Sequence, residues 1–433
     1  MPWDQTKDFL SNDELAALQT ARLRVTLTRA AAAPFYRAQW QAAGLDPAQI
    51  RGPEDIGRLP FTTKHDLRAG FPDGFLAVPR EEVVRVHVSS GTTGAPTAVY
   101  HTAGDLDRWA GLVARCLWMV GLRPADVFQN MVGYGLFSGG LGLHYGAEKL
   151  GALVIPSGVG NSRRQISLMR QFHTTAAHII PSYALKLAQT FGELGLDPAR
   201  DSDLRLLVVG AEPHSEATRR RLEEIYGARA MNCYGLSEMN GPGVAFECPE
   251  QNGLHLWEDA YLLEVVDPVT LAPVAPGEVG ELVLTTLERE AMPLVRYRTR
   301  DLASVLPGRC ACGRNHRRIS RITGRSDDMF IVKGVNIFPM QVEAVLMTFG
   351  ELAGNYLIEL DRRGPDDVVT VRAELREGRE ATGEEGLGLA RKLTAALKDE
   401  ILVTPRVELA PLGSLPAAEG KAVRVRDSRP AGA

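Results

Sequence analysis

Short β-branched segments alternate with helical segments through the middle of the chain, and this alternation constrains the fold more than any other feature. The strand-like runs are residues 83–88, 152–155, 176–180 and 204–209, and the helix-like runs are residues 166–172 and 215–226. Such alternation predicts a largely parallel sheet covered by helices. Residues 262–266 and 281–286 flank a turn rich in proline and glycine and predict an antiparallel pair, so the sheets are expected to be mixed.

Both ends of the chain depart from this pattern. Ser11 and Glu14 form a capping box, and apolar residues then recur at helical spacing until Pro34, which predicts an N-terminal helix. After Gly324 the predicted elements are strand 329–332, helix 339–349, a hairpin of 356–360 with 368–375, helix 387–402 and strand 407–409. The predicted fold class is therefore α/β, with a large N-terminal domain, residues 1–325, of mixed, mainly parallel sheets, and a small α+β C-terminal domain, residues 326–433.

The composition excludes several classes of protein. The 433 residues are 45% hydrophobic and 24% charged, which is ordinary for a globular protein. The net charge of -4 provides no basic stripe, so no nucleic-acid partner is expected. No apolar run reaches membrane-spanning length and the N-terminus lacks a signal core, so we expect a cytoplasmic protein with no membrane partner. Five cysteines at uneven spacing argue against a disulfide framework.

Residues 88–97, Val-Ser-Ser-Gly-Thr-Thr-Gly-Ala-Pro-Thr, are typical of a loop that binds phosphate. Glycines let backbone N–H groups turn inward, hydroxyls add donors, and the run 83–88 is expected to place this loop at the carboxyl end of a strand in the parallel sheet. The segment is not a Walker loop, because Ala95-Pro96 replaces the required Lys-Ser/Thr pair. Taken alone, it remains open to a second interpretation as a polar surface loop.

Four further stretches have residues suited to nucleotide chemistry. Tyr234 can stack on a base and Glu238 can hold Mg²⁺, Asp301 suits ribose hydroxyls, residues 324–329 suit a hinge, and Lys421 suits a developing phosphate charge. Each stretch also has a plain structural interpretation, as a buried tyrosine, a solvated charge or a linker.

Together, in this order and at these separations, the five stretches resemble the adenylate-forming superfamily of acyl-CoA synthetases, adenylation domains and luciferases. Within it the likeness is to phenylacetate-CoA ligases and covers nearly the whole chain, including residues 59–64 (LPFTTK), 133–140 (GYGLFSGG), 144–151 (HYGAEKLG) and 210–213 (GAEP). The resemblance implies ATP, Mg²⁺ and CoA as cofactors. It also implies that the C-terminal domain is a mobile lid, and it is the sole reason to expect a homodimer.

The resemblance assigns roles to individual positions. The implied nucleotide-binding residues are Ser89, Ser90, Gly91, Thr92, Thr93, Gly94, Ala211, Glu212, Pro213, Asn232, Tyr234, Gly235, Asp301 and Arg325. Catalysis is implied for Lys421, Glu238 and Arg325, with Mg²⁺ on Glu238 and with Lys421 between the acyl carboxylate and the α-phosphate. Asp327 is the implied hinge, and the implied CoA-side residues are Gly334, Val335 and Asn336. Thr97 stands where many superfamily members have a lysine, so the loop must bind phosphate through dipoles alone.

The acid-binding pocket is expected to be flat, partly apolar and lined in part by glycines. Its candidate residues are Tyr134, Gly135, Phe137, Ala211, Asn240, Gly241 and Pro242. Val132 and Asn240 depart from the phenylacetate pattern, and His178 is a further polar candidate. A buried amide or imidazole needs a partner, so we hypothesise an acid with an amino or hydroxyl group, such as an anthranilate or a hydroxybenzoate. The alternative, in which Asn240 bonds backbone and the acid is phenylacetate, stays open.

The cysteines suggest a metal site. Three thiolates and an imidazole, from Cys248, His255, Cys310 and Cys312, form a tetrahedral zinc set, with His316 as a reserve ligand. The alternative is a group of reduced, inert thiols. Cys116 and Cys233 fit no set and are expected in the core.

The leading functional hypothesis is an ATP-dependent aryl-acid:CoA ligase. The ionised carboxylate, with a pKa of about 4, is itself the nucleophile, so no general base is sought. Its partners are then a small aromatic carboxylic acid, ATP and CoA. One alternative passes the acyl group to a carrier-protein thiol or an amine. Another, a silent nucleotide-binding module, is disfavoured by the presence of Glu238, Asp301 and Lys421 together.

Overall fold

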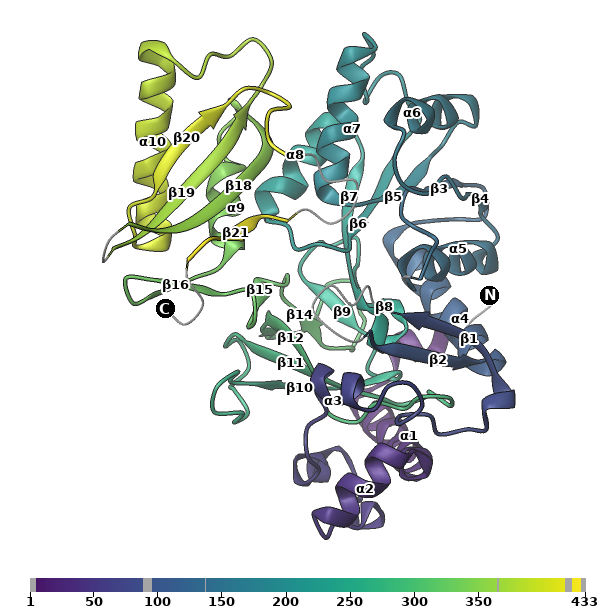
Figure 1. Ribbon diagram of the computed structural model, residues 1–433. Coiled ribbons are helices and arrows are strands. Elements are labelled where there is room, and N and C mark those ends of the chain that lie inside the picture. The colour runs from purple at the N-terminus through teal and green to yellow at the C-terminus, as the bar shows by residue number, and fades with distance from the viewer. Residues whose placement is uncertain (1–4, 89–95, 137, 364–365, 417–422, 430–433) are drawn as a thin grey trace. The chain divides into compact units, whose positions relative to one another are not determined.

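The computed structural model describes residues 5–88, 96–136, 138–363, 366–416 and 423–429 (Figure 1). The chain divides into two compact units. Unit 1 contains residues 1–158, 175–178 and 231–320, and unit 2 contains residues 159–174, 179–230 and 321–433. The C-terminal residues thus group with residues 159–230, and the expected domain boundary at residue 325 stays a prediction.

Unit 1 begins with the predicted N-terminal helix. Ser11 caps α1 (Asn12–Ala32) through a capping box with Glu14, which confirms the prediction. Pro34 begins α2 (Pro34–Ala42), because a proline is tolerated in the first turn of a helix. The short helices that accompany them are η1 (Gln5–Phe9), η2 (Pro47–Gln49), η3 (Pro53–Arg58), α3 (Lys64–Ala69) and η4 (Arg80–Glu82).

The strand predicted over residues 83–88 exists, but its partner differs from the expectation. β1 (Val83–Val88) pairs antiparallel with β2 (Ala98–Thr102), and Val88 lies opposite Ala98. These two strands form a sheet of their own, so the expectation that 83–88 belongs to the parallel sheet was wrong. The candidate phosphate-binding residues Ser89 to Gly94 connect the two strands in sequence and lie outside the described residues.

The central strands of unit 1 are of both kinds. β3 (Val127–Asn130) pairs in parallel with β4 (Leu153–Ile155) and β5 (Ala176–Ile179). β7 (Arg229–Leu236) pairs antiparallel with β8 (Gly241–Glu247), and the series continues through the strands β9 (Leu254–Leu256), β14 (Arg318–Ile319) and β13 (Val305–Leu306). A separate sheet contains, side by side and antiparallel, β10 (Tyr261–Val266), β11 (Gly280–Thr286) and β12 (Tyr297–Ala303), which confirms the predicted pair. The mixed sheets agree with the predicted fold class.

Among the helices of unit 1 that were not predicted, α4 (Ala103–Val120) and α5 (Ser138–Leu150) are the two longest. These two helices pack against each other and against β8. The glycines of α5 permit this contact, since a β-carbon on Gly142 would lie 2.3 Å from the Trp109 ring and one on Gly146 would lie 2.4 Å from Val113. Glycines that appear to weaken a helix in the sequence therefore allow two helices to approach closely here.

Unit 2 contains two groups of elements. The first comprises α6 (Ser162–Gln171), α7 (Pro181–Glu193), β6 (Leu206–Gly210) and α8 (Glu216–Tyr226). The second comprises β15 (Gly324–Arg325), β16 (Phe330–Val332), β17 (Val335–Ile337), α9 (Pro339–Leu346), β18 (Leu352–Arg363), β19 (Asp366–Leu375), α10 (Gly383–Ile401), β20 (Arg406–Ala410) and β21 (Val425–Asp427). Its main sheet has the order β20-β19-β18-β21, and α9 and α10 pack against each other. The predicted β18–β19 hairpin is confirmed, with pairing from Leu352–Leu375 to Arg363–Asp366.

A buried carboxyl group connects the two groups of unit 2. Glu343 of α9 accepts hydrogen bonds from the Ser215 backbone N–H (3.0 Å) and the Thr218 hydroxyl (2.7 Å) at the beginning of α8. The Tyr356 hydroxyl donates to its other oxygen at 3.3 Å. Burial raises the pKa of Glu343 above its ordinary value.

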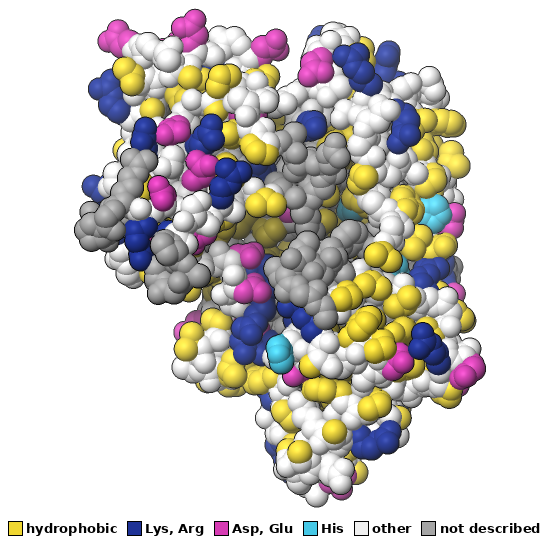
Figure 2. Space-filling view, in the orientation of Figure 1, with side chains coloured by type: hydrophobic (Ala, Val, Ile, Leu, Met, Phe, Trp, Pro, Cys, Tyr) yellow, Lys and Arg dark blue, Asp and Glu magenta, His cyan; other side chains and the backbone are white. Residues whose placement is uncertain are grey.

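Surface properties agree with the ordinary composition. Acidic and basic side chains are interspersed over the face that Figure 2 presents. Among the described residues, none of the helices combines the length and the apolar character that a bilayer crossing requires.

Candidate active site

Glu238, the predicted magnesium ligand, lies in unit 1 on the short helix η5 (Ser237–Met239) between β7 and β8. Only 6% of the residue is exposed. Its carboxylate forms an ion pair with Lys64 (Nζ–Oε1 3.6 Å), and its carbonyl oxygen accepts a hydrogen bond from Arg289 (2.8 Å). A carboxylate in this place can ligate Mg²⁺ and the lysine beside it can pair with a phosphate, and the magnesium role of Glu238 stays a prediction.

Two residues predicted separately for the nucleotide meet directly. The Tyr234 hydroxyl at β7 donates to the Asp301 carboxylate of β12 at 2.6 Å, and both residues are buried. The adjoining Asn232 is also buried, and its backbone N–H donates to Glu247 at 2.7 Å. The structure thus brings Tyr234 and Asp301 into contact from strands of two different sheets.

Gly235 lies opposite Pro242, next to Gly241, where β7 and β8 pair irregularly. A β-carbon on Gly235 would lie 2.1 Å from the carbonyl oxygen of Gly241, so a larger residue cannot stand there without moving a strand. Gly241 has its own constraint, because its φ is +97° and a β-carbon there would lie 2.5 Å from the Ser138 hydroxyl oxygen. Pro242 is fixed beside them, because its carbonyl accepts a hydrogen bond from Trp109 Nε1 at 2.9 Å.

The Tyr134 hydroxyl belongs to a chain of hydrogen-bonded polar groups, of which Asn130 and His178 are buried. Asn130 Nδ2 donates to the Tyr134 hydroxyl and to the Gly140 carbonyl, both at 2.8 Å, so Asn130 Oδ1 is left to accept from His178 Nδ1 at 3.2 Å. The Tyr134 hydroxyl lies 3.3 Å from His144 Nδ1, its remaining hydrogen-bond neighbour in this chain. Burial raises the pKa of Tyr134 to about 12 and lowers the pKa of His178 to about 3, so both are neutral at pH 7. Gly135 follows Tyr134 with open space where a β-carbon would lie, and the candidate Phe137 lies outside the described residues.

His178 provides a pH test of this arrangement. Because its pKa is about 3 in the folded protein and about 6.5 in an unfolded chain, the unfolded state binds a proton first as the pH falls. The folded state should therefore lose stability between pH 6.5 and pH 3, by about 2 kcal/mol at pH 5 from this one residue. We expect His178→Gln to remove that part of the pH dependence of urea unfolding. The exposed His173→Gln is the control, and equal pH slopes for His178→Gln and the wild type would refute the assignment.

Asn240 occupies a different environment from Tyr134. It adopts a left-handed backbone conformation (φ 77°) after η5, and it lines a cavity of about 20 Å³ together with Trp109, Tyr261 and Arg289. Its Oδ1 atom is buried and has no hydrogen-bond partner among the described residues. A cavity of this size holds about one water molecule and no aromatic ring. Contact between Asn240 and the acid stays a prediction.

The remaining candidates belong to unit 2. Ala211 has a positive φ of 69°, and Glu212 accepts a hydrogen bond from the Ser182 backbone N–H at the beginning of α7 (2.6 Å). Pro213 follows in the same loop before α8. Arg325, assigned to the nucleotide, forms a two-point ion pair with Asp327, assigned to the hinge, at 2.9 and 3.1 Å.

The candidate CoA-side residues form the turn of a small hairpin. Gly334, with φ 79°, connects β16 to β17, and Val335 and Asn336 begin β17. Asn336 is exposed. The catalytic candidate Lys421 lies outside the described residues.

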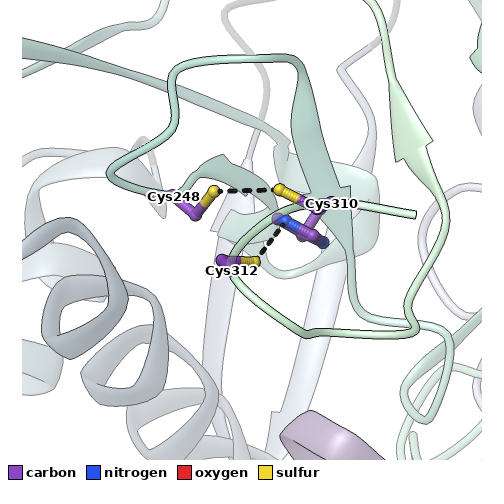
Figure 3. A group of neighbouring side chains, drawn as sticks. Cys248, Cys310 and Cys312 are labelled. Atoms are coloured by element: carbon purple, nitrogen blue, oxygen red, sulfur yellow. Dashed lines mark hydrogen bonds between the residues drawn. The ribbon is translucent and has the colours of Figure 1, made fainter. Parts of the chain in front are cut away.

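The four predicted zinc ligands come together in unit 1, although they derive from two separate segments (Figure 3). The ligand atoms of Cys248, His255, Cys310 and Cys312 all lie within 4.8 Å of one another. The Cys248 and Cys310 sulfurs are 3.6 Å apart, and the Cys312 sulfur is 3.3 Å from His255 Nε2. Tetrahedral zinc with bonds of about 2.3 Å to sulfur and 2.0 Å to nitrogen requires separations of about 3.8 and 3.6 Å, so the donor set fits this ion.

The surroundings prepare His255 to act as a ligand. Its Nδ1 lies 3.2 Å from the His316 carbonyl oxygen, so Nδ1 carries the hydrogen and Nε2 keeps its lone pair for a metal. Burial lowers the pKa of His255 to about 4, so the ring is neutral at pH 7. His316 is no reserve ligand: its Nδ1 accepts from the Glu258 backbone N–H (3.2 Å), and its Nε2 donates to the Lys7 carbonyl (2.8 Å). Cys116 and Cys233 are buried apart from this group, as expected.

Three residues around the site were missed as functional candidates. They are Lys64, Asn130 and Arg289. Lys64 stands in the segment LPFTTK, which gave a signal through its likeness to other ligases. Asn130 and Arg289 gave none, because sequence spacing does not reveal which polar side chains turn inward.

Comparison with known proteins identifies the family. The model of the AMP-binding enzymes matches residues 10–287, and the model of their C-terminal domain matches residues 334–429. The chain therefore belongs to the AMP-binding enzyme family.

Its relatives include phenylacetate-coenzyme A ligases. The enzyme of Escherichia coli is 46% identical over 97% of this chain and 96% of its own length, and that of Thermus thermophilus is 45% identical over 99% and 100%. A solved structure of 2-hydroxyisobutyryl-CoA ligase with its acyl-adenylate, in the postadenylation state, matches with a TM-score of 0.92 at 31% identity. That match covers 98% of this chain and 92% of the other.

Proposed function

We propose that this chain activates phenylacetate or an amino- or hydroxy-substituted benzoate-type acid and transfers it to CoA. The protein is an AMP-forming acid–CoA ligase, which uses ATP to convert an aryl acid into an acyl-adenylate and then into an aryl-CoA thioester. The observation that carries this conclusion is the nearly full-length match to phenylacetate-CoA ligases.

In the first half-reaction the acid carboxylate attacks the α-phosphate of ATP and expels pyrophosphate, and the main barrier is the repulsion of two anions. Glu238, buried and paired with Lys64, fits a magnesium ligand, and the ion would supply charge neutralisation between the phosphates. Residues 89–94 donate to the phosphates, and Lys421 approaches the carboxylate and the α-phosphate. Binding both reactants in one site supplies the entropic advantage.

The nucleotide contacts are proposed for the residues that follow. Asp301 binds the ribose hydroxyls and Tyr234 orients the Asp301 carboxylate through their 2.6 Å hydrogen bond, while residues 211–213 and 232–235 line the adenine. Arg325 binds at the ribose and phosphate edge. Because Arg325 is paired with Asp327, nucleotide binding must release or share that ion pair.

In the second half-reaction a lid of residues 326–433 turns about Asp327. Residues 334–336 then line the path of the CoA thiol, which attacks the acyl-adenylate and expels AMP. The exposed hairpin turn at Gly334 and Asn336 supports this role, since an accessible turn can approach a ligand without unfolding its strands.

The cysteine group is proposed as a structural zinc site. Its four donor atoms leave no position for a substrate, as in closed zinc sites. The protein is further proposed to be a cytoplasmic homodimer that binds neither nucleic acid nor membrane.

Pyrophosphate exchange across a panel of aromatic acids tests the function, followed by mass analysis of the products formed with CoA. Acid-dependent exchange and an aryl-CoA product are expected. If no acid in the panel promotes exchange, the assignment of the reaction fails. If exchange occurs without a CoA product, the acceptor is wrong and the adenylation step stands.

Asn240→Met tests the choice of acid. If Asn240 contacts a polar substituent, the variant should reverse the wild-type preference between substituted benzoates and phenylacetate, measured as a ratio of kcat/KM values. Leu112→Met, which changes another residue of the same cavity, controls for altered packing. An unchanged preference in Asn240→Met would leave phenylacetate as the better candidate.

A further inference from the structure

Arg289 is a buried arginine that holds two backbone segments of unit 1. Only 3% of the residue is exposed. Its Nη1 donates to the carbonyl oxygen of Glu238, and its Nη2 donates to the carbonyl oxygen of Tyr100, each at 2.8 Å. One planar guanidinium group therefore connects η5 to β2.

In the sequence, the two connected segments contain or follow the residues proposed for the metal and the phosphates. Glu238 is the proposed magnesium ligand, and Tyr100 lies in β2, which begins at Ala98 directly after the phosphate-binding stretch. The guanidinium fork is rigid, so it fixes the separation of the two carbonyl groups in a way that a flexible ammonium group does not.

This arrangement is not one that stability alone favours. Burying a guanidinium group is costly, and the two hydrogen bonds go to neutral carbonyl groups. Burial lowers the pKa of Arg289, although the nearby Asp105 carboxylate acts in the opposite direction. Asp105 also accepts hydrogen bonds from the backbone N–H groups of Glu290 (2.8 Å) and Ala291 (2.9 Å), which fixes the segment that carries Arg289.

A second observation connects Arg289 to the far end of η5. Arg289 Nε and Asn240 Oδ1 are both buried without a hydrogen-bond partner among the described residues, and both residues line the cavity of about 20 Å³. A donor and an acceptor around a space for one water molecule form a suitable site for a bridging water. Arg289 holds η5 directly at Glu238, and a water in this cavity would connect it to Asn240 as well.

We propose that Arg289 is a positioning residue for adenylation, which sets the place of the Glu238 carboxylate relative to the strand that follows the phosphate-binding stretch. This inference rests on the proposed role of Glu238 in binding Mg²⁺. Arg289 touches neither the reacting atoms nor the metal, and it acts through the backbone of η5.

The test compares the two half-reactions in the full-length Arg289→Lys variant. A lysine keeps the charge but cannot span both carbonyl groups. Because small misplacements of a catalytic group are costly, we expect adenylation, measured by pyrophosphate exchange, to fall about 100-fold. The Mg²⁺ concentration for half-maximal exchange should rise about 10-fold, as when groups supporting a metal ligand are removed. Thioester formation from a preformed aryl-adenylate and CoA should stay within about 2-fold of the wild type, since it needs no triphosphate.

Arg108→Lys is the matched control. Arg108 lines the same cavity but is less buried and pairs with Asp105 and Glu290. The Arg108→Lys variant should change neither the Mg²⁺ dependence of exchange nor the ratio of the rates of the two half-reactions. The proposal is refuted if Arg289→Lys retains the wild-type Mg²⁺ dependence, or if both half-reactions fall equally, which indicates a general structural role. Failure of the wild-type enzyme to exchange pyrophosphate would instead refute the proposed function.

Discussion

Glu238→Gln is expected to reduce adenylation about 100- to 1000-fold, because a neutral amide cannot replace a carboxylate that balances a divalent cation in a buried site. The structure makes this effect large. Glu238 is almost entirely buried, Lys64 is the only ion-pair partner it has among the described residues, and no other buried carboxylate takes part in that contact. The measurement is acid-dependent pyrophosphate exchange over a range of Mg²⁺ concentrations.

Glu264→Gln serves as the control for Glu238→Gln. Glu264 pairs with Arg296 at 2.7 Å, and it lies in β10 outside the candidate site. Its replacement removes an ion pair and should alter thermal stability while leaving the Mg²⁺ dependence unchanged. A Glu238→Gln variant with normal exchange at low Mg²⁺ would show that the metal is held elsewhere.

Cys310→Ser should abolish zinc binding and destabilise unit 1. A ligand present at about 1,000 times its Kd stabilises the folded state by about 4 kcal/mol, so loss of the metal should lower the free energy of unfolding by several kcal/mol. Elemental analysis should find about one zinc per wild-type chain and close to none in the variant. A chelator should lower the unfolding temperature of the wild type and leave that of the variant unchanged.

Cys233→Ser is the matched control for the zinc experiment. Cys233 is buried but does not belong to the cysteine and histidine group, so this variant should keep its zinc despite a change in packing. A wild-type protein purified without chelator and free of zinc would support the alternative of reduced, inert thiols.

Much of the fold could be predicted because local patterns determine it. The capping box at Ser11, the β18–β19 hairpin and the β10–β11 pair all depend on residues that are close in sequence. The partner of β1 could not be predicted in this way, since a strand pattern does not specify which strand lies beside it. α5 was missed because glycines disfavour a helix, and the contact with α4 explains two of them, Gly142 and Gly146.

The same distinction between local patterns and tertiary contacts applies to the candidate site. The zinc donors were found because their chemistry is distinctive, and Tyr234 and Asp301 were found separately through motifs before the structure joined them. The environment of Asn240 was not foreseen, because the side-chain direction depends on a left-handed backbone conformation that spacing does not encode. Arg289 was missed because a buried arginine looks like a solvated one in a sequence.

The contact made by Glu343 couples proton binding to the arrangement of unit 2. Its pKa is raised while it is buried against Ser215 and Thr218, and exposure to water would return that pKa toward 4.5. The closed contact therefore binds a proton more tightly than an open one. The stabilisation that the protonated Glu343 carboxyl gives to the closed contact is fully present below pH 4.5, and it is lost as the pH rises through the raised pKa. Separation of α9 from α8 would accordingly release protons. Measuring the protons released into a weakly buffered solution would report that movement without any label on the protein.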